Sequence, residues 1–404
     1  MLFLASLIII ISTIYQLPHQ DYYILFLFIF LPQVLTLFIK TNKRTTNDRL
    51  SSSDVGAPTV SIIISAKNEE SVIAKTLVAV NNISYPSEKI EIFIVDNNST
   101  DRTNEIATEY SKKDKRVNIY KSLNISGMKA SGLNEVFPIT SGEILFLLDA
   151  DAIVDPNILN TNLAFFEDPQ VGAVNAMLIC RNQTTNTLTK LIHHEYSFDS
   201  GCLTGGATMI RRTAWLQAGG WNESVLTEDF YMTMSLVKNG WQIIFPRCSP
   251  VSIIAPEQIL HFLKQRRRWA KGDLGCLFDH FSEVAKNLIF LRSKMPNLGF
   301  ILSDLITSIG VFSLAIGYFA QKSSSSTLAA SIILFMLSHA IRGHKSLVDL
   351  RGAGILFPFW FYFYSFHAVL FYLYAFFELA IFPKMQIKWH QFPHGSTSQQ
   401  LDKQ

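Results

Sequence analysis

Three acidic sites and one basic-aromatic site follow one another along the chain, and their residue types suit chemistry on a phosphate-bearing substrate. The sites are Asp96, Asp149-Ala150-Asp151, Thr227-Glu228-Asp229 and Gln265-Arg266-Arg267-Arg268-Trp269. Between Asp229 and Gln265 lie 35 residues. Carboxylates can hold a hard divalent cation or accept a proton from a hydroxyl group. Guanidinium groups bind phosphate oxygens, and an indole ring can stack against a sugar. The set predicts a charged, activated sugar, held by a metal and passed to an acceptor.

Asp149 and Asp151 directly follow Ile144–Leu148, an apolar run of strand length. Two carboxylates one residue apart can reach the same ligand where the backbone turns, and oxygen ligands suit Mg²⁺ or Mn²⁺. Such a metal would neutralise a nucleotide diphosphate as it leaves. The simpler alternative is a strand end followed by turn residues, because aspartate also favours turns.

Asp96 ends a second apolar run, and Asp229 precedes a helical stretch, Phe230–Lys238. The Asp96 carboxylate could accept hydrogen bonds from a base or a ribose. Its alternative role is an Asx-turn ahead of a helix that is capped by Asp101. Asp229 could be a general base, which must lie within hydrogen-bond reach of the proton that it accepts. The alternative for Asp229 is simple helix capping, with Thr227 as the N-cap residue.

The spacing of Gln265, Arg268 and Trp269 places them on one face of a helix. That face would offer an indole ring and a guanidinium group to a sugar and its phosphates. Arg266 and Arg267 are expected to point elsewhere, toward lipid headgroups. The alternative is a basic helix at the membrane interface with no catalytic part.

Lys129 and the segment Thr204–Ala207 carry weaker signals. Lys129 could balance the charge of a diphosphate, although a solvated lysine at a helix start is equally compatible with the sequence. Thr204–Ala207 contains two adjacent glycines, which give a permissive backbone near the acceptor side.

The elements that must position these residues alternate between strand and helix after Pro58. The predicted strands are Val60–Ser65, Ile90–Asp96 and Glu143–Asp149, and the predicted helices are Glu69–Val80, Asp101–Ser111, Lys129–Val136 and Pro256–Gly272. This alternation favours an α/β, Rossmann-like fold of the doubly wound type with a mostly parallel sheet. Ligands bind beyond the carboxyl ends of such strands, so Asn68, Asp96 and Asp149 should converge on one site.

The first 39 residues are strongly apolar in a chain that is 49% apolar and only 17% charged. The uncharged runs Leu2–Ile14 and Tyr22–Ile39 predict a transmembrane hairpin in residues 1–39, not a cleaved signal peptide. Residues 40–56 are polar and predict a linker. Four Lys or Arg residues between 40 and 49, against none in the short loop of the hairpin, place the following domain in the cytosol.

The C-terminal third is apolar again and predicts a transmembrane region over residues 291–383. We expect spans at Leu298–Phe319 and Leu328–Ile341, with a third span or a re-entrant segment within Ile355–Phe382. The remaining boundaries are a catalytic domain over 57–255, interfacial amphipathic helices over 256–290 and a polar tail over 384–404. The layout predicts an integral protein of the bacterial inner (plasma) membrane with a cytosolic catalytic domain.

Charge and cysteine usage exclude other classes of protein. A net charge of +3 gives no reason to expect nucleic acid as a partner. The four cysteines form no CxxC pair and lie in the predicted cytosolic part, so we expect thiols and neither disulfides nor zinc ligands.

Taken together, the motifs resemble those of the membrane-integrated family 2 glycosyltransferases, which include cellulose, hyaluronan and poly-N-acetylglucosamine synthases and several glycolipid synthases. The family signature is Asp, Asp-X-Asp, (Thr/Ser)-Glu-Asp and Gln-X-X-Arg-Trp, with about 35 residues between the last two. The chain matches it in order from residue 58 to residue 275. Ser65–Glu70 is similar to the opening strand-end motif of the family, and Lys129 to the lysine of its Gly-Lys-Ala motif.

The resemblance implies a GT-A fold and a metal-dependent, inverting transfer from a UDP-sugar, with Mg²⁺ or Mn²⁺ as cofactor. It implies that Glu69 and Asp96 contact the nucleoside, that Lys129 and Asp149 bind the sugar nucleotide, that Asp151 binds the metal and that Asp229 is the base. The implied diphosphate and acceptor site consists of Gln265, Arg268 and Trp269.

Two departures from the family pattern bear on the substrate. Asn97 and Asn98 stand where the family often has Asp-Gly, so Asp96 could bind the base differently. The stretch His193–Gly206 is shorter than in polymer synthases, which argues against processive elongation. We expect transfer of a hexose or N-acetylhexosamine to a growing polysaccharide, with single transfer to a lipid as the alternative and an inactive scaffold of an export complex as the remote one. An export partner stays open.

Overall fold

The computed structural model describes residues 56–123, 128–196 and 202–279, and five residues between 371 and 379. The first three ranges belong to one compact unit. The predicted hairpin over 1–39, the linker up to residue 55, the interfacial region after Asp279 and the C-terminal membrane region and tail lie outside the described residues, those five apart. Within the described ranges, no helix is both long and apolar enough to cross a membrane.

A seven-stranded sheet forms the centre of this unit, in the order β3-β2-β1-β4-β8-β6-β9. The strands are β1 (Val60–Ala66), β2 (Ile90–Asp96), β3 (Val117–Lys121), β4 (Ile144–Asp149), β6 (Val171–Asn175), β8 (Ala207–Arg211) and β9 (Gln242–Ile244). Only β8 runs antiparallel to its neighbours in this sheet. The central strands β1, β2 and β4 are nearly continuous apolar runs because both faces of the sheet are covered. The predicted α/β class with a mostly parallel sheet is confirmed.

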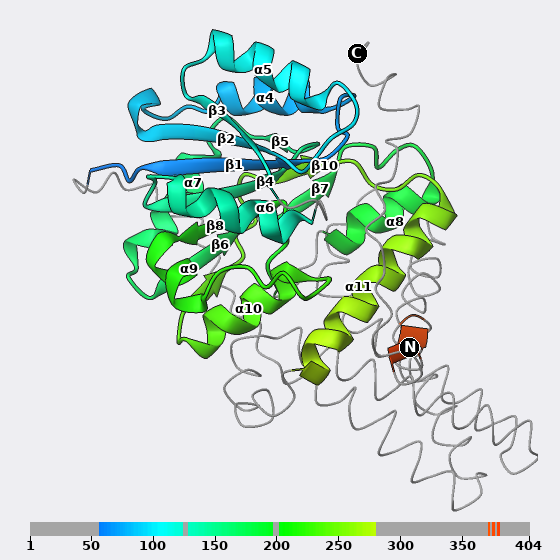
Figure 1. The fold of residues 1–404 in the computed structure, drawn as a ribbon. Coiled ribbons are helices and arrows are strands. Elements are labelled where there is room, and N and C mark those ends of the chain that lie inside the picture. Colours follow the sequence, from blue (N-terminus) through cyan, green and yellow to red (C-terminus); the bar gives the residue numbers. More distant parts are fainter. Residues whose placement is uncertain are drawn as a thin grey trace, which may run out of the picture. The chain divides into compact units, whose positions relative to one another are not determined.

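Helices cover both faces of the sheet and produce two buried apolar layers (Figure 1). On one face lie α4 (Ile73–Asn81), α5 (Thr103–Lys113) and α7 (Ile158–Leu163), and on the other α6 (Lys129–Val136), α9 (Arg212–Ala218) and α10 (Glu228–Lys238). Alternate residues of β1 supply the two layers, with Ile62 and Ile64 on one side and Ile63 on the other. The short 3₁₀ helices are η2 (Ser87–Lys89), η3 (Phe137–Ile139) and η4 (Ala164–Glu167).

The first helix begins later than the sequence predicts, at Ile73 and not at Glu69. Asn68 adopts a positive φ of 56°, which turns the chain after β1. The amide of Glu69 then donates to Thr103 Oγ1 at 2.7 Å, so this segment is fixed to the start of α5 before α4 begins. Long-range contacts of this kind leave no periodic signal in the sequence.

A second sheet has three strands, all of which follow β4 in the sequence, and their order in the sheet is β5-β10-β7. Its strands are β5 (Ile153–Val154), β7 (Leu178–Cys180) and β10 (Val251–Ile253). Two further helices follow strands of this sheet, α8 (Thr187–Tyr196) after β7 and α11 (Ile259–Asp279) after β10. The four cysteines of the chain all lie in the described residues and are present as thiols.

Helix α11 differs from the helix predicted over Pro256–Gly272. It begins at Ile259 and continues through Gly272 to Asp279, a total of 21 residues. A Cβ on Gly272 would lie 2.6 Å from Cγ2 of Thr227. Gly272 therefore allows α11 to approach the start of α10, and the interpretation of this glycine as a helix end was wrong.

The strand register brings the predicted site residues to one edge of the main sheet. Ala66 of β1 is paired with Asp96 of β2, and Ser65 is paired with Asp149 of β4. Since these three strands are parallel neighbours, their carboxyl ends and the loops that follow them lie together.

Candidate active site

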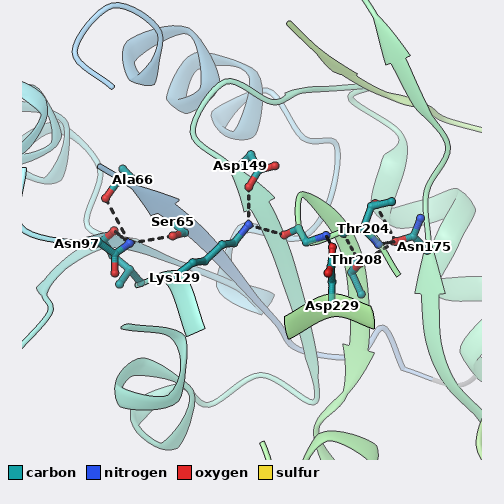
Figure 2. Close-up of polar contacts among 11 residues, drawn as sticks. Ser65, Ala66, Asn97, Lys129, Asp149, Asn175, Thr204, Thr208 and Asp229 are labelled. Atoms are coloured by element: carbon teal, nitrogen blue, oxygen red, sulfur yellow. Dashed lines mark hydrogen bonds and ion pairs between the residues drawn. The ribbon is translucent and has the colours of Figure 1, made fainter. Parts of the chain in front are cut away.

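Lys129 is the centre of the polar contacts at this edge of the sheet (Figure 2). Its Nζ donates to Oδ1 of Asp149 at 2.5 Å and to the carbonyl oxygen of Gly205 at 2.9 Å. Burial alone would lower the pKa of Lys129, but the negative charges of Asp149, Glu228 and Asp229 outweigh burial and raise the pKa. Lys129 is therefore cationic at neutral pH, at the end of β4 where a diphosphate was predicted to bind.

Asp229 binds the backbone amide of the same residue, Gly205. Its Oδ2 accepts a hydrogen bond from the Gly205 amide at 3.1 Å, while Oδ1 accepts one from the Phe230 amide at 2.9 Å. Thr227 is the N-cap residue of α10, as predicted, but its hydroxyl makes no capping bond and lies 3.7 Å from Sγ of Cys276. Asp229 thus stands in the first turn of a helix and also faces the segment that binds Lys129.

Gly206 has no room for a side chain, and Gly205 has little. A Cβ on Gly206 would lie 2.1 Å from Oδ2 of Asp149, which is closer than real Cβ atoms approach an oxygen. A Cβ on Gly205 would lie 3.1 Å from Nζ of Lys129 and 3.6 Å from Oε1 of Glu228. The two glycines therefore bring the backbone against the charged groups themselves, which the sequence indicated only as a permissive backbone.

Asn175, at the end of β6, holds this glycine segment in place. Its Oδ1 accepts hydrogen bonds from the amide of Thr204 at 2.7 Å and from the Thr204 hydroxyl at 3.0 Å (Figure 2). The hydroxyl of Thr208, in β8, lies 2.7 Å from the same oxygen. A buried amide on one strand therefore fixes the turn that enters the next strand, and with it the position of Gly205.

Glu228, which precedes Asp229, has a pKa that is raised into the neutral range. Burial and the negative charge of Asp229 raise the pKa of Glu228 to about 7, although Lys129 and Arg268 act in the opposite direction. The contribution of Arg268 shows that this arginine of α11 lies close enough to Glu228 for their charges to interact. No role for Glu228 was predicted from the sequence.

Asp96 has the contacts of its alternative role, a turn at the end of β2. Its Oδ1 accepts from the Ser99 amide at 2.8 Å, and its Oδ2 accepts from Nδ2 of Asn104 at 3.0 Å. The N-cap residue of α5 is Arg102 and not Asp101, but Oδ1 of Asp101 accepts from the amide and the hydroxyl of Thr103, the first residue of the helix, at 3.0 and 2.6 Å. These bonds lower the pKa of Asp101 despite its partial burial. The nucleoside contact assigned to Asp96 by resemblance remains a prediction.

The loop that carries Glu69 is joined to the loop after β2. The amide of Asn68 donates to Oγ of Ser99 at 3.0 Å, and Oδ1 of Asn68 accepts from the amide of Thr100 at 2.6 Å. The loops after β1 and β2 therefore form one rigid edge, next to Asp96. The role predicted for Glu69 at the nucleoside stays a prediction.

Asp151 lies between the two sheets of the unit. Its Oδ2 accepts a hydrogen bond from the amide of Ile254 at 2.9 Å, and its carbonyl oxygen accepts one from Nη1 of Arg181 at 2.7 Å. In the described part of the chain, no three His, Cys, Asp or Glu side chains are grouped to hold a metal. Mg²⁺ often takes only one or two protein carboxylates, and substrate phosphates and water complete its shell. The half-exposed carboxylate of Asp149 and that of Asp151 are a donor set of this kind.

The predicted acceptor residues Gln265, Arg268 and Trp269 lie in the middle of α11. Oε1 of Gln265 is buried and has no hydrogen-bond donor among the described residues. The ring of Trp269 is tilted by 44° against the ring of Tyr196 in α8, with 6.5 Å between the centroids. Trp269 thus contacts α8, while the charge of Arg268 lowers the pKa of Glu228.

Arg266 was expected from the sequence to point toward lipid headgroups, and the structure contradicts this prediction. It is 6% exposed, and its guanidinium group donates to both carboxylate oxygens of Glu195, at 2.9 and 2.5 Å. Arg266 was assigned to lipid headgroups because its partner, Glu195, lies 71 residues away in the sequence. Nothing in the helical spacing identifies that partner.

Lys129, Asp149 and Asp229 were therefore predicted from the sequence, but what joins them was missed. The available signal for Gly205 and Gly206 was that two glycines are adjacent in the sequence, directly before β8. Asn175 gave no signal, because a single buried asparagine at a strand end is not a motif.

Comparison with known proteins places this geometry in a family. Residues 61–227 match the family described as Glycosyl transferase family 2. The chain is 34% identical over 265 residues to a β-monoglucosyldiacylglycerol synthase of Nostoc, in a match that covers 62% of this chain and 56% of the relative. It is also 29% identical over 247 residues to a poly-β-1,6-N-acetyl-D-glucosamine synthase of Staphylococcus aureus, covering 57% of this chain and 58% of the relative. The match thus spans little more than half the length of these relatives.

A mannosyltransferase structure from Pyrobaculum calidifontis, in complex with GDP-Man and Mn²⁺, shares the fold with a TM-score of 0.59 at 17% sequence identity. The likeness covers 93% of this chain and 99% of that one, and it shows a GT-A-like fold. A probable glycosyltransferase of Bacillus subtilis, YdaM, is 30% identical over 293 residues, which are 65% of this chain and 70% of that protein. With this coverage and the family match, the chain belongs to glycosyl transferase family 2.

Proposed function

We propose that this chain is a membrane-bound, metal-dependent glycosyltransferase that moves one hexose or N-acetylhexosamine from a UDP-sugar to a lipid acceptor, with inversion at the anomeric carbon. The observation that carries the proposal is that Gly205 binds Lys129 through its carbonyl oxygen and Asp229 through its amide. A cation for the donor and a carboxylate for the acceptor are thus held by the backbone of one residue.

Asp229 is the proposed base. A single displacement needs one group that takes the proton from the acceptor hydroxyl as its oxygen attacks the anomeric carbon. The Gly205 amide holds Oδ2 of Asp229, so the carboxylate is oriented before substrate arrives. One base and one displacement give inversion, and no second carboxylate nucleophile is required.

The donor would occupy the carboxyl edge of the sheet beside Lys129 and Asp149. The cationic Lys129 would neutralise part of the diphosphate charge, and Asp149 would hold the sugar nucleotide. Asp149 and Asp151 would bind Mg²⁺ or Mn²⁺, which supplies charge neutralisation for the departing UDP. Support for a metal is the pair of hard oxygen donors that this edge presents, together with the Mn²⁺ in the complex of the mannosyltransferase that shares the fold.

A lipid acceptor now has better support than the growing polysaccharide expected from the sequence. The relative at 34% identity is a glycolipid synthase, while the polysaccharide synthase relative is 29% identical. The short stretch His193–Gly206 also favours single transfer. A membrane location with the catalytic domain in the cytosol agrees with a lipid acceptor, and it stays a proposal together with any export partner.

The proposed donor chemistry is tested by UDP release. Membranes that contain the full chain would be incubated with a panel of UDP-sugars, Mn²⁺ or Mg²⁺ and a diacylglycerol acceptor. UDP release from one or two of these sugars, dependent on metal and on Lys129, is expected. Equal release by a Lys129→Met variant would contradict the assignment of the donor site.

A further inference from the structure

Arg266 and Glu195 form an ion pair that joins two helices of the described unit, with the arginine side chain 6% exposed and the glutamate side chain 31% exposed. Arg266 lies in α11, between Gln265 and Arg268, while Glu195 is the penultimate residue of α8. Both carboxylate oxygens accept from the guanidinium group, at 2.9 and 2.5 Å. The two parallel hydrogen bonds fix the plane of the guanidinium as well as its position.

The same guanidinium group is stacked on aromatic rings. Its Cζ lies 4.4 Å from the centroid of Trp269, 5.0 Å from that of Phe262 and 6.0 Å from that of Tyr196. A cation above an aromatic face is attracted by the ring quadrupole, and the attraction is larger where water is excluded. Because the ion pair fixes the guanidinium, the guanidinium in turn restricts the orientation of the Trp269 ring.

Stability alone is a weak explanation for this arrangement. Burying the Arg266 guanidinium group is costly, and replacement of a buried ion pair by apolar residues of similar volume is often neutral for stability. What apolar residues cannot reproduce is a directional contact that ties α8 to α11 and sets one plane for the Trp269 ring.

We infer that Arg266 and Glu195 are positioning residues for the acceptor side of the site, and that they act through the ring of Trp269. The inference rests on the proposed function and on the acceptor role that the family resemblance implies for Trp269. It predicts that the ion pair affects one step of the reaction and not another. Binding of the nucleotide sugar, which depends on Lys129 and Asp149, should not need the pair, whereas transfer to the acceptor should.

The experiment compares transfer with hydrolysis in membranes that contain the full chain. The variants are Arg266→Lys, Glu195→Gln and the neutral pair Glu195→Gln with Arg266→Met, which removes both charges together and keeps the volume. Lys264→Met is the matched control, because Lys264 is an exposed cation of the same helix. Two rates are measured, sugar transfer to diacylglycerol and release of UDP to water without acceptor.

We expect Arg266→Lys and the neutral pair to lower kcat/KM for the acceptor by about tenfold or more, with UDP release to water unchanged within about twofold. Lys264→Met should change neither rate. Wild-type transfer by the neutral pair, or a parallel fall in both rates, would overturn the inference.

A wild-type protein without sugar transfer would contradict the proposed function and leave the positioning testable by fluorescence. The emission of Trp269, obtained as the difference from a Trp269→Phe variant, should change in Arg266→Lys and stay unchanged in Lys264→Met. Unchanged emission in Arg266→Lys would overturn the positioning role itself.

Discussion

Lys129 and Asp229 are joined through the backbone of a single residue, Gly205, whose carbonyl oxygen binds the lysine and whose amide binds the carboxylate. The lysine begins α6 and the aspartate lies in the first turn of α10, on the same face of the sheet. The amide and the carbonyl of Gly205 belong to two successive planar peptide groups, and the two hydrogen bonds hold both charges against this short backbone segment. Preorganisation of this kind lowers the reorganisation that the reaction would otherwise require.

The two glycines of this segment should differ in their tolerance of a methyl group. Gly206→Ala would place its Cβ against Oδ2 of Asp149, and we expect a loss of activity of about 100-fold. Gly205→Ala would meet the flexible end of Lys129 at 3.1 Å and should cost about tenfold or less. The two variants form a matched pair, measured by UDP release and by thermal unfolding. Equal losses would contradict the steric account.

Asp229→Asn should abolish transfer and leave the fold intact. Asparagine retains an oxygen that can accept from the Gly205 amide, but it cannot take the acceptor proton. We expect a fall in kcat of about 10²–10⁴-fold, with little change in the affinity for UDP measured by titration calorimetry. Weaker UDP binding together with wild-type kcat would reassign Asp229 from the acceptor to the donor.

Glu228 should make the stability of the protein depend on pH. Its pKa in the folded state is about 7, above the ordinary value of 4.5, because burial and Asp229 disfavour its charged form. The folded state therefore holds this proton more tightly, and stability falls as pH rises from about 4.5 to about 7. Glu228→Gln removes that loss, so the variant should be more stable than wild type at pH 8 by about 1–3 kcal/mol and nearly equal to it at pH 4.

The measurement is chemical denaturation of wild type and Glu228→Gln at both pH values. Glu109→Gln, at an exposed position of α5, is the control. A Glu228→Gln variant that is less stable than wild type at pH 8 would mean that the attraction between Glu228 and Lys129 exceeds the cost of burying the carboxylate.

Asp151→Asn should weaken the response to metal. Its oxygen can still accept from the amide of Ile254, so the loop between the sheets should keep its position. We expect the Mn²⁺ concentration for half-maximal activity to rise by about tenfold or more, and chelation of metal to abolish wild-type activity. Asp155→Asn, at an exposed position of the same segment, should titrate like wild type. A wild-type metal response in Asp151→Asn would remove Asp151 from the metal site.

The sheet could be predicted from the sequence because its central strands are buried on both faces. The run Ile144–Leu148 has no polar residue and is followed by Asp149, and the apolar strand β2 ends in Asp96. The sequence therefore indicated these strands and their site residues together. Boundaries set by distant partners were not visible. The start of α4 depends on the bond between Glu69 and Thr103, and nothing near Glu69 in the sequence encodes it.

The sequence predicted side chains of the site but not the backbone that binds them. Lys129, Asp149 and Asp229 were identified by motif, but the common partner of Lys129 and Asp229 is the backbone of a glycine 76 residues from Lys129. Arg266 was assigned the wrong environment for the same reason. A helical pattern shows which residues share a face, but not whether that face meets solvent or a partner such as Glu195.

The most direct test of the proposed function is the fate of a labelled sugar. Membranes that contain wild type or Asp229→Asn would receive a panel of labelled UDP-sugars with Mn²⁺, and the label would be separated into solvent-extractable lipid and high-molecular-weight polymer. We expect label in the lipid fraction with wild type and none with Asp229→Asn. Label that accumulates in polymer, or lipid label that survives Asp229→Asn, would contradict the proposed function.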